Sequence, residues 1–205
     1  FNQSIKKIQI NADDTVNVWS NSLSWNANRI VLATSPWQTM KLLPEHPELE
    51  KCAQDLQQFN YEPITNIYFQ YSQPVRLPYP MLGILNASCH WIFDRVFVSQ
   101  PNILCAVITG TTSMEFCTQE LLSKQVLQDI CKHFPHLASP IATKVICEKR
   151  AAFTCDVTIQ RFRPQARTAL KNLFLCGDYL QTGLPATLEG ALLSGRQTAL
   201  EILSD

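Results

Sequence analysis

Four of the six glycines in this chain fall between residues 177 and 195, and Asp178 follows the first of them directly. Before the Gly-Asp pair, the apolar run over residues 173–176 predicts a short buried strand. After it, a Gly/Pro-containing turn leads into residues 188–203, whose apolar spacing predicts a closing helix. The clustering of a scarce residue type indicates a place where bare backbone is needed.

This arrangement suits the binding of a large polar or anionic ligand. Ligands of open α/β sheets lie outside the carboxyl ends of the strands, and a helix amino terminus offers free N–H groups. Ala186, Gly190 and Ser194 recur at every fourth position, which lets backbone approach either a ligand or another helix. Packing alone explains this spacing equally well, and an Asp such as Asp178 can also cap a loop.

The elements that must position this segment mix strands and helices. Alternating apolar residues between Ile8 and Val18 predict a hairpin, and the run over 30–33 predicts a strand buried on both faces. Ser35, with Pro next and Gln three positions on, predicts a helix start. The other expected elements are an amphipathic helix over 47–59, strands over 67–71, 81–85, 90–98, 103–109 and 142–153, and a helix from the capping box Thr112-x-x-Glu115 to Phe134.

Composition excludes several classes of protein. The chain is 46% hydrophobic and 17% charged, with 17 basic and 17 acidic residues, which argues against disorder and against a basic surface for duplex nucleic acid. The longest apolar stretch, residues 103–108, is far shorter than the roughly 18 residues of a membrane span. We therefore expect a soluble globular protein.

Cysteine usage and the first residue add two expectations. The eight cysteines include no C-x-x-C pair and most lie in apolar runs, so we expect reduced core thiols of a cytosolic protein rather than a disulfide framework. The chain begins at Phe1, directly in a strand-like pattern, so we expect it to be part of a longer polypeptide.

The segment Asn172-Leu-Phe-Leu-Cys-Gly-Asp-Tyr-Leu-Gln-Thr-Gly-Leu-Pro-Ala-Thr-Leu-Glu-Gly-Ala resembles the carboxyl-terminal flavin-binding signature of the flavin-containing amine oxidase and phytoene desaturase superfamily. Further motifs are similar to its squalene-associated branch in hopanoid pathways, the hydroxysqualene dehydroxylases. These motifs are Arg29-Ile-Val-Leu-Ala-Thr-Ser-Pro-Trp-Gln, Tyr61-Glu-Pro-Ile-Thr, Leu77-Pro-Tyr-Pro-Met-Leu-Gly, Trp91-Ile-Phe-Asp-Arg95 and Glu148-Lys-Arg-Ala-Ala-Phe153.

The resemblance implies FAD as cofactor and assigns residues to it. Asp178 would meet the ribityl–pyrophosphate part of FAD, and the other residues would lie along the flavin: Gly177, Gly183, Pro185, Ala186, Thr187 and Glu189. It also implies a long apolar tunnel for an isoprenoid chain, lined by Trp37, Tyr61, Pro63, Met81, Leu82, Trp91 and Phe93.

The reaction implied by the resemblance is the reduction of hydroxysqualene to squalene. Reduced flavin would deliver a hydride to the allylic cation left when the hydroxyl departs, in a dry pocket that the protein supplies. No catalytic residue is identified. The candidates for a polar role near the pocket are Asp94, Arg95, Lys149 and Arg150. Solvated strand ends explain these four more readily.

One family feature is absent from the sequence. It contains no G-x-G-x-x-G, the motif that holds the FAD pyrophosphate, so we expect an incomplete FAD site with weak or no binding by the chain alone. The expected fold is α+β. Residues 1–34 border the flavin domain, residues 35–153 form a substrate-binding domain with a mixed or antiparallel sheet and helices, and residues 154–205 return to a Rossmann-like FAD-binding domain whose amino-terminal half is missing.

Two hypotheses follow. The first is the carboxyl-terminal part of an FAD-dependent oxidoreductase acting on a long isoprenoid by this reduction or a related desaturation, inactive alone and completed by the missing amino-terminal half. The alternative is a stand-alone isoprenoid-binding module or subunit that shares a flavin site with a partner chain. We expect no nucleic acid partner, and a location in the cytoplasm or at the face of the inner membrane.

Two weaker signals are interpreted as structural. Pro135 interrupts the cluster Cys131-x-His133-x-x-His136, and no fourth ligand follows at a usual spacing, so we expect no metal site. The basic–aromatic cluster of Arg161, Phe162, Arg163 and Arg167 could contact phosphate or anionic lipid, but it has fewer charges than lipid-binding patches usually carry. We therefore expect a solvated loop.

Overall fold

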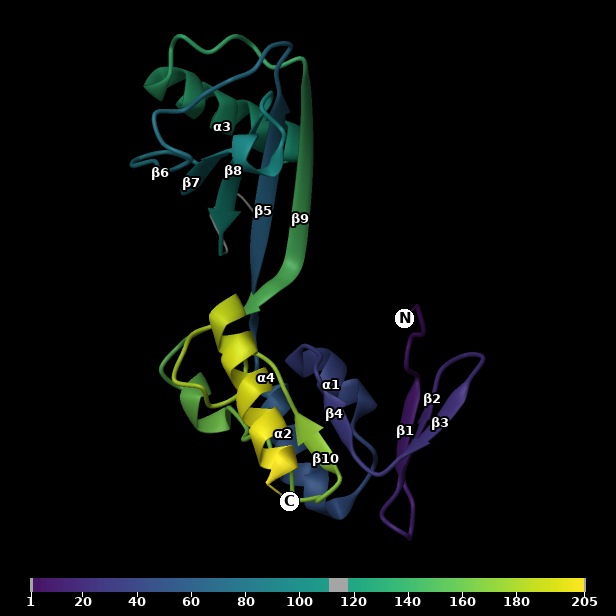
Figure 1. Cartoon of the computed structure of the whole chain (residues 1–205). Helices are drawn as coiled ribbons and strands as arrows, with labels where there is room; N and C mark the ends of the chain where they lie inside the picture. The colour runs from purple at the N-terminus through teal and green to yellow at the C-terminus, as the bar shows by residue number, and fades with distance from the viewer. Residues whose placement is uncertain (1, 111–117, 205) are drawn as a thin grey trace. The chain divides into compact units, whose positions relative to one another are not determined.

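The computed structural model describes residues 2–110 and 118–204, which form two compact units (Figure 1). Unit 1 consists of Phe1–Asn60 and Phe153–Asp205, and unit 2 of Tyr61–Ala152. Residues 35–60, expected in the substrate-binding domain, thus lie in unit 1. The physical reason is aromatic packing, since Phe59 makes edge-to-face contacts with Phe153 at 5.3 Å and with Tyr179 at 6.1 Å between ring centroids.

Unit 1 begins with a three-stranded antiparallel sheet of β1 (Lys7–Ile10), β2 (Val16–Trp19) and β3 (Ser24–Ala27). The predicted hairpin is confirmed, with Ile8 opposite Val18.

A second sheet of unit 1 pairs β4 (Ile30–Leu32) in parallel with β10 (Leu173–Leu175). Every residue of β10 is buried, as predicted. The prediction for β4 was wrong in one respect, because Val31 is 40% exposed and the strand is covered on one face only. The outer edge of β10 is bridged by Arg167, whereas no strand of the described residues pairs with the outer edge of β4.

The helices of unit 1 follow the predicted positions. Pro36 opens α1 (Pro36–Leu42), and the expected helix over 47–59 is a 3-10 turn followed by α2 (Glu50–Gln57). The basic segment near Arg163 opens with the 3-10 turn η3 (Ile159–Phe162), and α4 (Leu188–Leu203) closes the chain.

The helix α4 buries small residues and exposes leucines, which is the reverse of a typical surface helix. Its buried residues are Gly190, Ser194 and Thr198, and the hydroxyls of Ser194 and Thr198 bond to the backbone at the end of β10. The side chains of Leu188 and Leu192 point to solvent and are 87% and 70% exposed. Surface helices normally bury their large apolar residues, so this helix carries an outward apolar face that unit 1 leaves uncovered.

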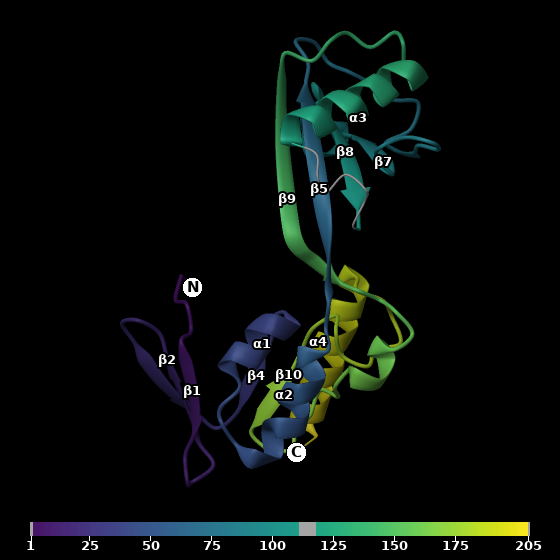
Figure 2. The same cartoon turned by 180° about the vertical axis from the view of Figure 1, so that it is seen from behind.

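Unit 2 is a five-stranded sheet in the order β6-β7-β8-β5-β9, with α3 (Gln119–His133) beside it (Figure 2). Val126 and Ile130 of α3 join the buried cluster that includes Ile92 and Leu104. The strands are β5 (Tyr61–Gln70), β6 (Met81–Gly83), β7 (Trp91–Asp94), β8 (Ile103–Thr109) and β9 (Ala142–Phe153).

Two predicted boundaries in unit 2 need comment. The strand expected over 90–98 ends at Asp94, because the Asp94 carboxylate accepts the Val96 N–H at 3.0 Å and starts the 3-10 turn η2 (Arg95–Val98). The capping box predicted at Thr112-x-x-Glu115 lies outside the described residues, and α3 begins at Gln119 with the Thr118 hydroxyl accepting the Leu121 N–H.

The described cysteines are free thiols, but not all of them are core residues. Cys89 and Cys105 are buried as expected, whereas Cys131, Cys147 and Cys155 are exposed. The prediction of core cysteines was wrong for these three, because they occupy outward positions of α3, β9 and the loop after it. Among the described residues, no helix combines the length and the apolar character needed to cross a bilayer.

Candidate flavin and substrate sites

The candidate cofactor segment begins where β10 ends, at a glycine that no other residue can replace without movement. A Cβ built on Gly177 would lie 2.5 Å from Cε1 of Tyr179. The Tyr179 ring is fully buried, and its hydroxyl lies 3.1 Å from the hydroxyl of Thr39 on α1. The tyrosine therefore anchors the loop in the interior of unit 1, and Gly177 leaves the space that its ring occupies.

Hydrogen bonds attach α4 to the end of β10. The Gly177 N–H donates to Oγ of Ser194 at 2.9 Å, and the Thr198 hydroxyl donates to the Leu175 carbonyl at 3.0 Å. A Cβ on Gly190 would come 3.2 Å from the Pro185 carbonyl oxygen. The small-residue stripe thus makes packing contacts within unit 1.

Asp178 is half-buried beside this anchor. Burial raises the pKa of its carboxyl, and this effect is opposed by the backbone N–H groups of Asp178 and Tyr179 and by the positive charge of Arg163. A carboxylate that is partly desolvated, yet still reachable from solvent, is well suited to accept hydrogen bonds from ligand hydroxyls.

The other residues expected along the flavin lie on the exposed stretch that follows. Gly183 has a φ of +77°, and a Cβ there would meet nothing within 4 Å. Pro185, Thr187 and Glu189 are exposed, while Ala186 is half-buried and donates its N–H to Sγ of Cys155 at 3.3 Å. Thr187 caps α4 by accepting the Gly190 N–H at 3.1 Å.

These residues fit one side of an FAD molecule. The loop offers the Asp178 carboxylate, open space over Gly183 and the amino terminus of the 16-residue α4, whose first amides have no partner inside the helix. The sequence holds no second glycine-rich cradle for the pyrophosphate. The loop thus offers acceptor and donor groups suited to a polar cofactor, and the roles of the individual residues stay predictions.

The basic segment contains the residue that sequence reasoning missed. Arg163 was expected in a solvated loop, but it is only 2% exposed. Its guanidinium donates to the carbonyl oxygens of Asp178 at 2.7 Å and Leu184 at 2.6 Å. The expectation was wrong because the loop between β10 and α4 turns its carbonyl groups towards this one side chain.

In unit 2, three of the candidate substrate residues, Met81, Trp91 and Phe93, lie on the sheet face opposite α3. Strand register pairs Met81 with Phe93, and Phe93 with Cys105. Cys105 in turn pairs with Tyr68. Residues paired in this way share a face, so these side chains form one row across four strands.

The next row on this face pairs Trp91 with Val107. Met81 is 49% exposed and Trp91 is 39% exposed, and neither belongs to the buried cluster beneath α3. We call Met81, Trp91, Phe93, Val107 and Tyr68 the open face of the sheet.

Not all of the predicted tunnel residues lie on the open face. Leu82 pairs with Ile92 and packs against the buried cluster, because adjacent strand residues point to opposite sides. Tyr61 and Pro63 are separated from Ile67 and Phe69 by even numbers of positions along β5, so all four point to the same side of the strand. Ile67 and Phe69 belong to the buried cluster on the α3 side. These three residues are therefore not part of the open face, and their role in a tunnel stays a prediction.

Trp37 belongs to unit 1, whereas the open face belongs to unit 2. It lies on α1 in unit 1, where the Lys41 ammonium stands 4.5 Å from the centre of its ring. Its role in a tunnel stays a prediction.

The polar candidates differ in their surroundings. The Asp94 carboxylate is 7% exposed and accepts the N–H groups of Leu77 at 3.2 Å and Val96 at 3.0 Å, contacts that favour a structural role. Arg95 stands 5.3 Å from the centre of the Tyr68 ring and donates to Gln100 at 2.6 Å. Lys149 and Arg150 are exposed on β9. Arg95 thus contacts Tyr68, a residue of the open face.

Comparison with known proteins places this geometry in a family. The family model described as flavin containing amine oxidoreductase matches residues 1–203. The chain is 30% identical to a hydroxysqualene dehydroxylase of Rhodopseudomonas palustris over 85% of this chain and 38% of that protein. It is 25% identical to a 15-cis-phytoene desaturase of an Oncidium hybrid cultivar over 100% of this chain and 38% of that protein.

A solved structure shows a similar fold. Cyclohexylamine oxidase from Brevibacterium oxydans aligns with a TM-score of 0.72 and 17% identity, over 98% of this chain and 48% of that one. The chain spans well under half the length of the curated relatives that it matches. With a family model that covers almost every residue, the chain belongs to the flavin containing amine oxidoreductases.

Proposed function

We propose that this chain is the carboxyl-terminal part of an FAD-dependent oxidoreductase that acts on a long isoprenoid. Family membership supports the flavin, and relatives named hydroxysqualene dehydroxylase and phytoene desaturase support the substrate class. The specific reaction that we propose is the conversion of hydroxysqualene and reduced flavin to squalene, water and oxidised flavin.

The observation that carries the proposal is an unfinished parallel sheet next to the cofactor loop. Parallel sheets in α/β proteins are covered on both faces and consist of several strands, whereas β4 and β10 form a pair. The outer edge of β4, with its exposed Val31, has the form of an edge to which a further strand can pair. The exposed side chains of Leu188 and Leu192 on α4 form an apolar surface that a further part of the protein can bury. We propose that the preceding part of the polypeptide supplies both and completes the flavin site.

The residues of this chain would hold the cofactor on one side. The Asp178 carboxylate would accept hydrogen bonds from hydroxyl groups of FAD, and the amides that open α4 would donate to its polar atoms. Bound FAD, when reduced, supplies the hydride that replaces the substrate hydroxyl.

The open face would hold the hydrocarbon substrate. Met81, Trp91 and Phe93 offer apolar and aromatic surface on one face of the sheet, which favours a long chain of isoprene units. Arg95, beside Tyr68, is the polar group at this surface that is best placed to contact the departing oxygen.

A product assay with the intact polypeptide tests the proposal. Reduced FAD and hydroxysqualene are incubated with the protein under anaerobic conditions, and the lipid extract is separated by gas chromatography with mass detection. We expect squalene to form in amounts stoichiometric with oxidised flavin. Unchanged hydroxysqualene in the presence of bound flavin would overturn the reaction but not the cofactor, and absence of bound flavin would overturn the cofactor.

A further inference from the structure

Arg163 makes a set of contacts that joins most of the cofactor-facing loop to one side chain. Its Nε donates to the Tyr179 carbonyl at 3.2 Å, and Nη1 donates to the Leu184 carbonyl at 2.6 Å. Its Nη2 donates to the Asp178 carbonyl at 2.7 Å and to the Thr182 hydroxyl at 3.3 Å. All three guanidinium nitrogens are therefore used, on four residues within seven positions of the chain.

Burying the charged guanidinium of Arg163 costs free energy, which its contacts must offset. Desolvation lowers the pKa of the Arg163 guanidinium, and removing a charge from water costs several kcal/mol before its partners offset it. The offset comes from three carbonyl oxygens, from the nearby charge of Asp178, and from the Phe153 ring, whose centre lies 5.4 Å away. A planar fork of fixed N–H directions is required, which a lysine ammonium cannot reproduce.

The contacts also affect the Asp178 side chain. The carbonyl of Asp178 faces Arg163, so the trans peptide turns the Tyr179 N–H to the opposite side. That N–H opposes the effect of burial on the pKa of the Asp178 carboxyl. The guanidinium thus fixes the peptide group that follows Asp178, the residue that the proposed function assigns to the cofactor.

We propose that Arg163 is a positioning residue that holds the loop from Asp178 to Leu184 in its cofactor-binding conformation before the cofactor arrives. The assignment of the loop to FAD rests on the proposed function, whereas the fixing of the loop by Arg163 does not. A loop ordered in advance binds its ligand without the entropy cost of ordering on contact.

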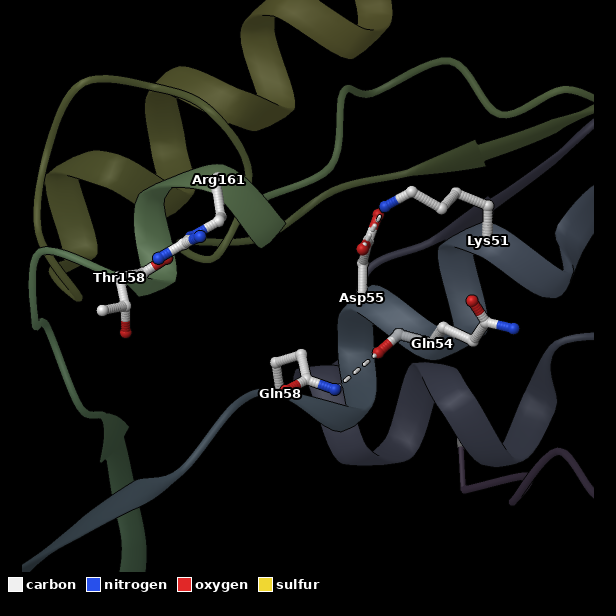
Figure 3. A network of polar contacts seen from close by, with 6 residues as sticks. All are labelled: Lys51, Gln54, Asp55, Gln58, Thr158 and Arg161. Atoms are coloured by element: carbon white, nitrogen blue, oxygen red, sulfur yellow. Dashed lines mark hydrogen bonds and ion pairs between the residues drawn. The ribbon is translucent and has the colours of Figure 1, made fainter.

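The neighbouring Arg161 provides a matched control. Its side chain is exposed, and its Nε donates only to the Thr158 carbonyl of the same 3-10 turn, at 3.4 Å (Figure 3). Removing Arg161 deletes an equal charge two positions away without touching the loop.

The first experiment follows amide hydrogen exchange in the 205-residue chain, with peptides covering residues 177–187 resolved by mass spectrometry. We expect Arg163→Ala to speed exchange in these peptides by about tenfold or more, and Arg161→Ala to leave it unchanged. Arg163→Lys should resemble Arg163→Ala, because the charge is kept and the fork is lost. It also carries the test should the alanine variant fail to fold.

A rescue experiment separates positioning from general support of the fold. Guanidinium at low millimolar concentration should restore slow exchange to Arg163→Ala, and methylammonium at the same concentration should not. Unchanged exchange in folded Arg163→Ala, or wild-type exchange in Arg163→Lys, would overturn the proposal.

The same variants in the intact polypeptide connect the loop to the flavin. We expect the FAD dissociation constant to rise about tenfold in Arg163→Ala and to fall back with guanidinium. Faster loop exchange with unchanged FAD affinity would overturn the positioning role. If the wild-type protein binds no FAD, the proposed function fails, and hydrogen exchange still decides whether Arg163 fixes the loop.

Discussion

Ser194 and Gly177 lie 17 positions apart and are joined by one hydrogen bond, in which the Gly177 N–H donates to Oγ of Ser194 at 2.9 Å. This bond fixes the end of β10 to the second turn of α4, so the intervening loop is closed at its base. The same serine donates to the Ala191 carbonyl at 2.8 Å, which satisfies the hydroxyl completely in the buried face of the helix.

Loss of the Ser194 hydroxyl should therefore destabilise unit 1. Ser194→Ala leaves the partly buried Gly177 N–H without its acceptor, and we expect the free energy of unfolding to fall by about 1–3 kcal/mol. Ser204→Ala is the control, because that exposed hydroxyl contacts only the Glu201 carbonyl and its loss should cost under about 0.5 kcal/mol. Urea unfolding followed by circular dichroism measures both, and equal losses would contradict the account.

Gly177 should tolerate no side chain. In Gly177→Ala the new Cβ meets the buried Tyr179 ring at 2.5 Å and 2.7 Å, and relief requires the ring or the strand end to move. We expect a loss of about 1–3 kcal/mol in the free energy of unfolding.

Gly195 provides the contrast for that substitution within the same region. A Cβ there would sit 3.5 Å from Sγ of Cys176, an ordinary contact, and alanine favours a helix by about 1 kcal/mol over glycine. Gly195→Ala should be neutral or stabilising in the same urea experiment. A Gly177→Ala protein as stable as Gly195→Ala would show that the Tyr179 ring does not define the loop.

The charged form of Asp178, which the proposed function assigns to the cofactor, should lower the free energy of unfolding at neutral pH. Its pKa is raised in the folded state, so the native protein binds the proton more tightly than the unfolded chain. Stability then decreases as the pH rises from the ordinary aspartate value of 3.8 through the raised value. Asp178→Asn removes this penalty.

We therefore expect Asp178→Asn to be at least as stable as the wild type at pH 7, with the difference shrinking as the pH falls below 4. Thermal melts across this pH range measure it. A stability loss at pH 7 would contradict the burial argument, because it would mean that the charged form is favoured in the fold.

Two adjacent residues of β6 distinguish the open face from the core. Met81→Lys places a charge where the side chain is already 49% exposed, so the protein should stay folded with its flavin content unchanged while turnover of a long isoprenoid falls at least about tenfold. Leu82→Lys places the same charge against the buried cluster and should lower stability and flavin content as well. Equal effects of the two variants on stability would contradict the face assignment.

Much of the fold follows from the sequence because hydrophobic alternation and capping are local signals. The bounds of β8, β9 and α4 agree with those that the apolar pattern predicts. Alternation would also have separated Met81 from Leu82, since neighbouring strand residues cannot line the same surface.

The burial of Arg163 has no such local signal. Its acceptors are carbonyl groups 15 to 21 positions later in the chain, and backbone carbonyls have no signature in a sequence. The exposure of Val31 could not be predicted for a different reason. Its apolar side chain is typical of a strand that is covered on both faces, whereas this chain covers one face of β4. Sequence reasoning thus locates the cofactor loop but not what holds it.

The most direct test of the account is a flavin titration of the 205-residue chain beside the intact polypeptide, following the quenching of free FAD fluorescence and the visible flavin band. The account predicts saturable binding to the intact protein, weaker binding to its Asp178→Asn variant, and no saturation with the 205-residue chain, because the chain presents one side of the site. Equal affinity of the chain and the intact protein would contradict the claim that the flavin site is shared between the two parts.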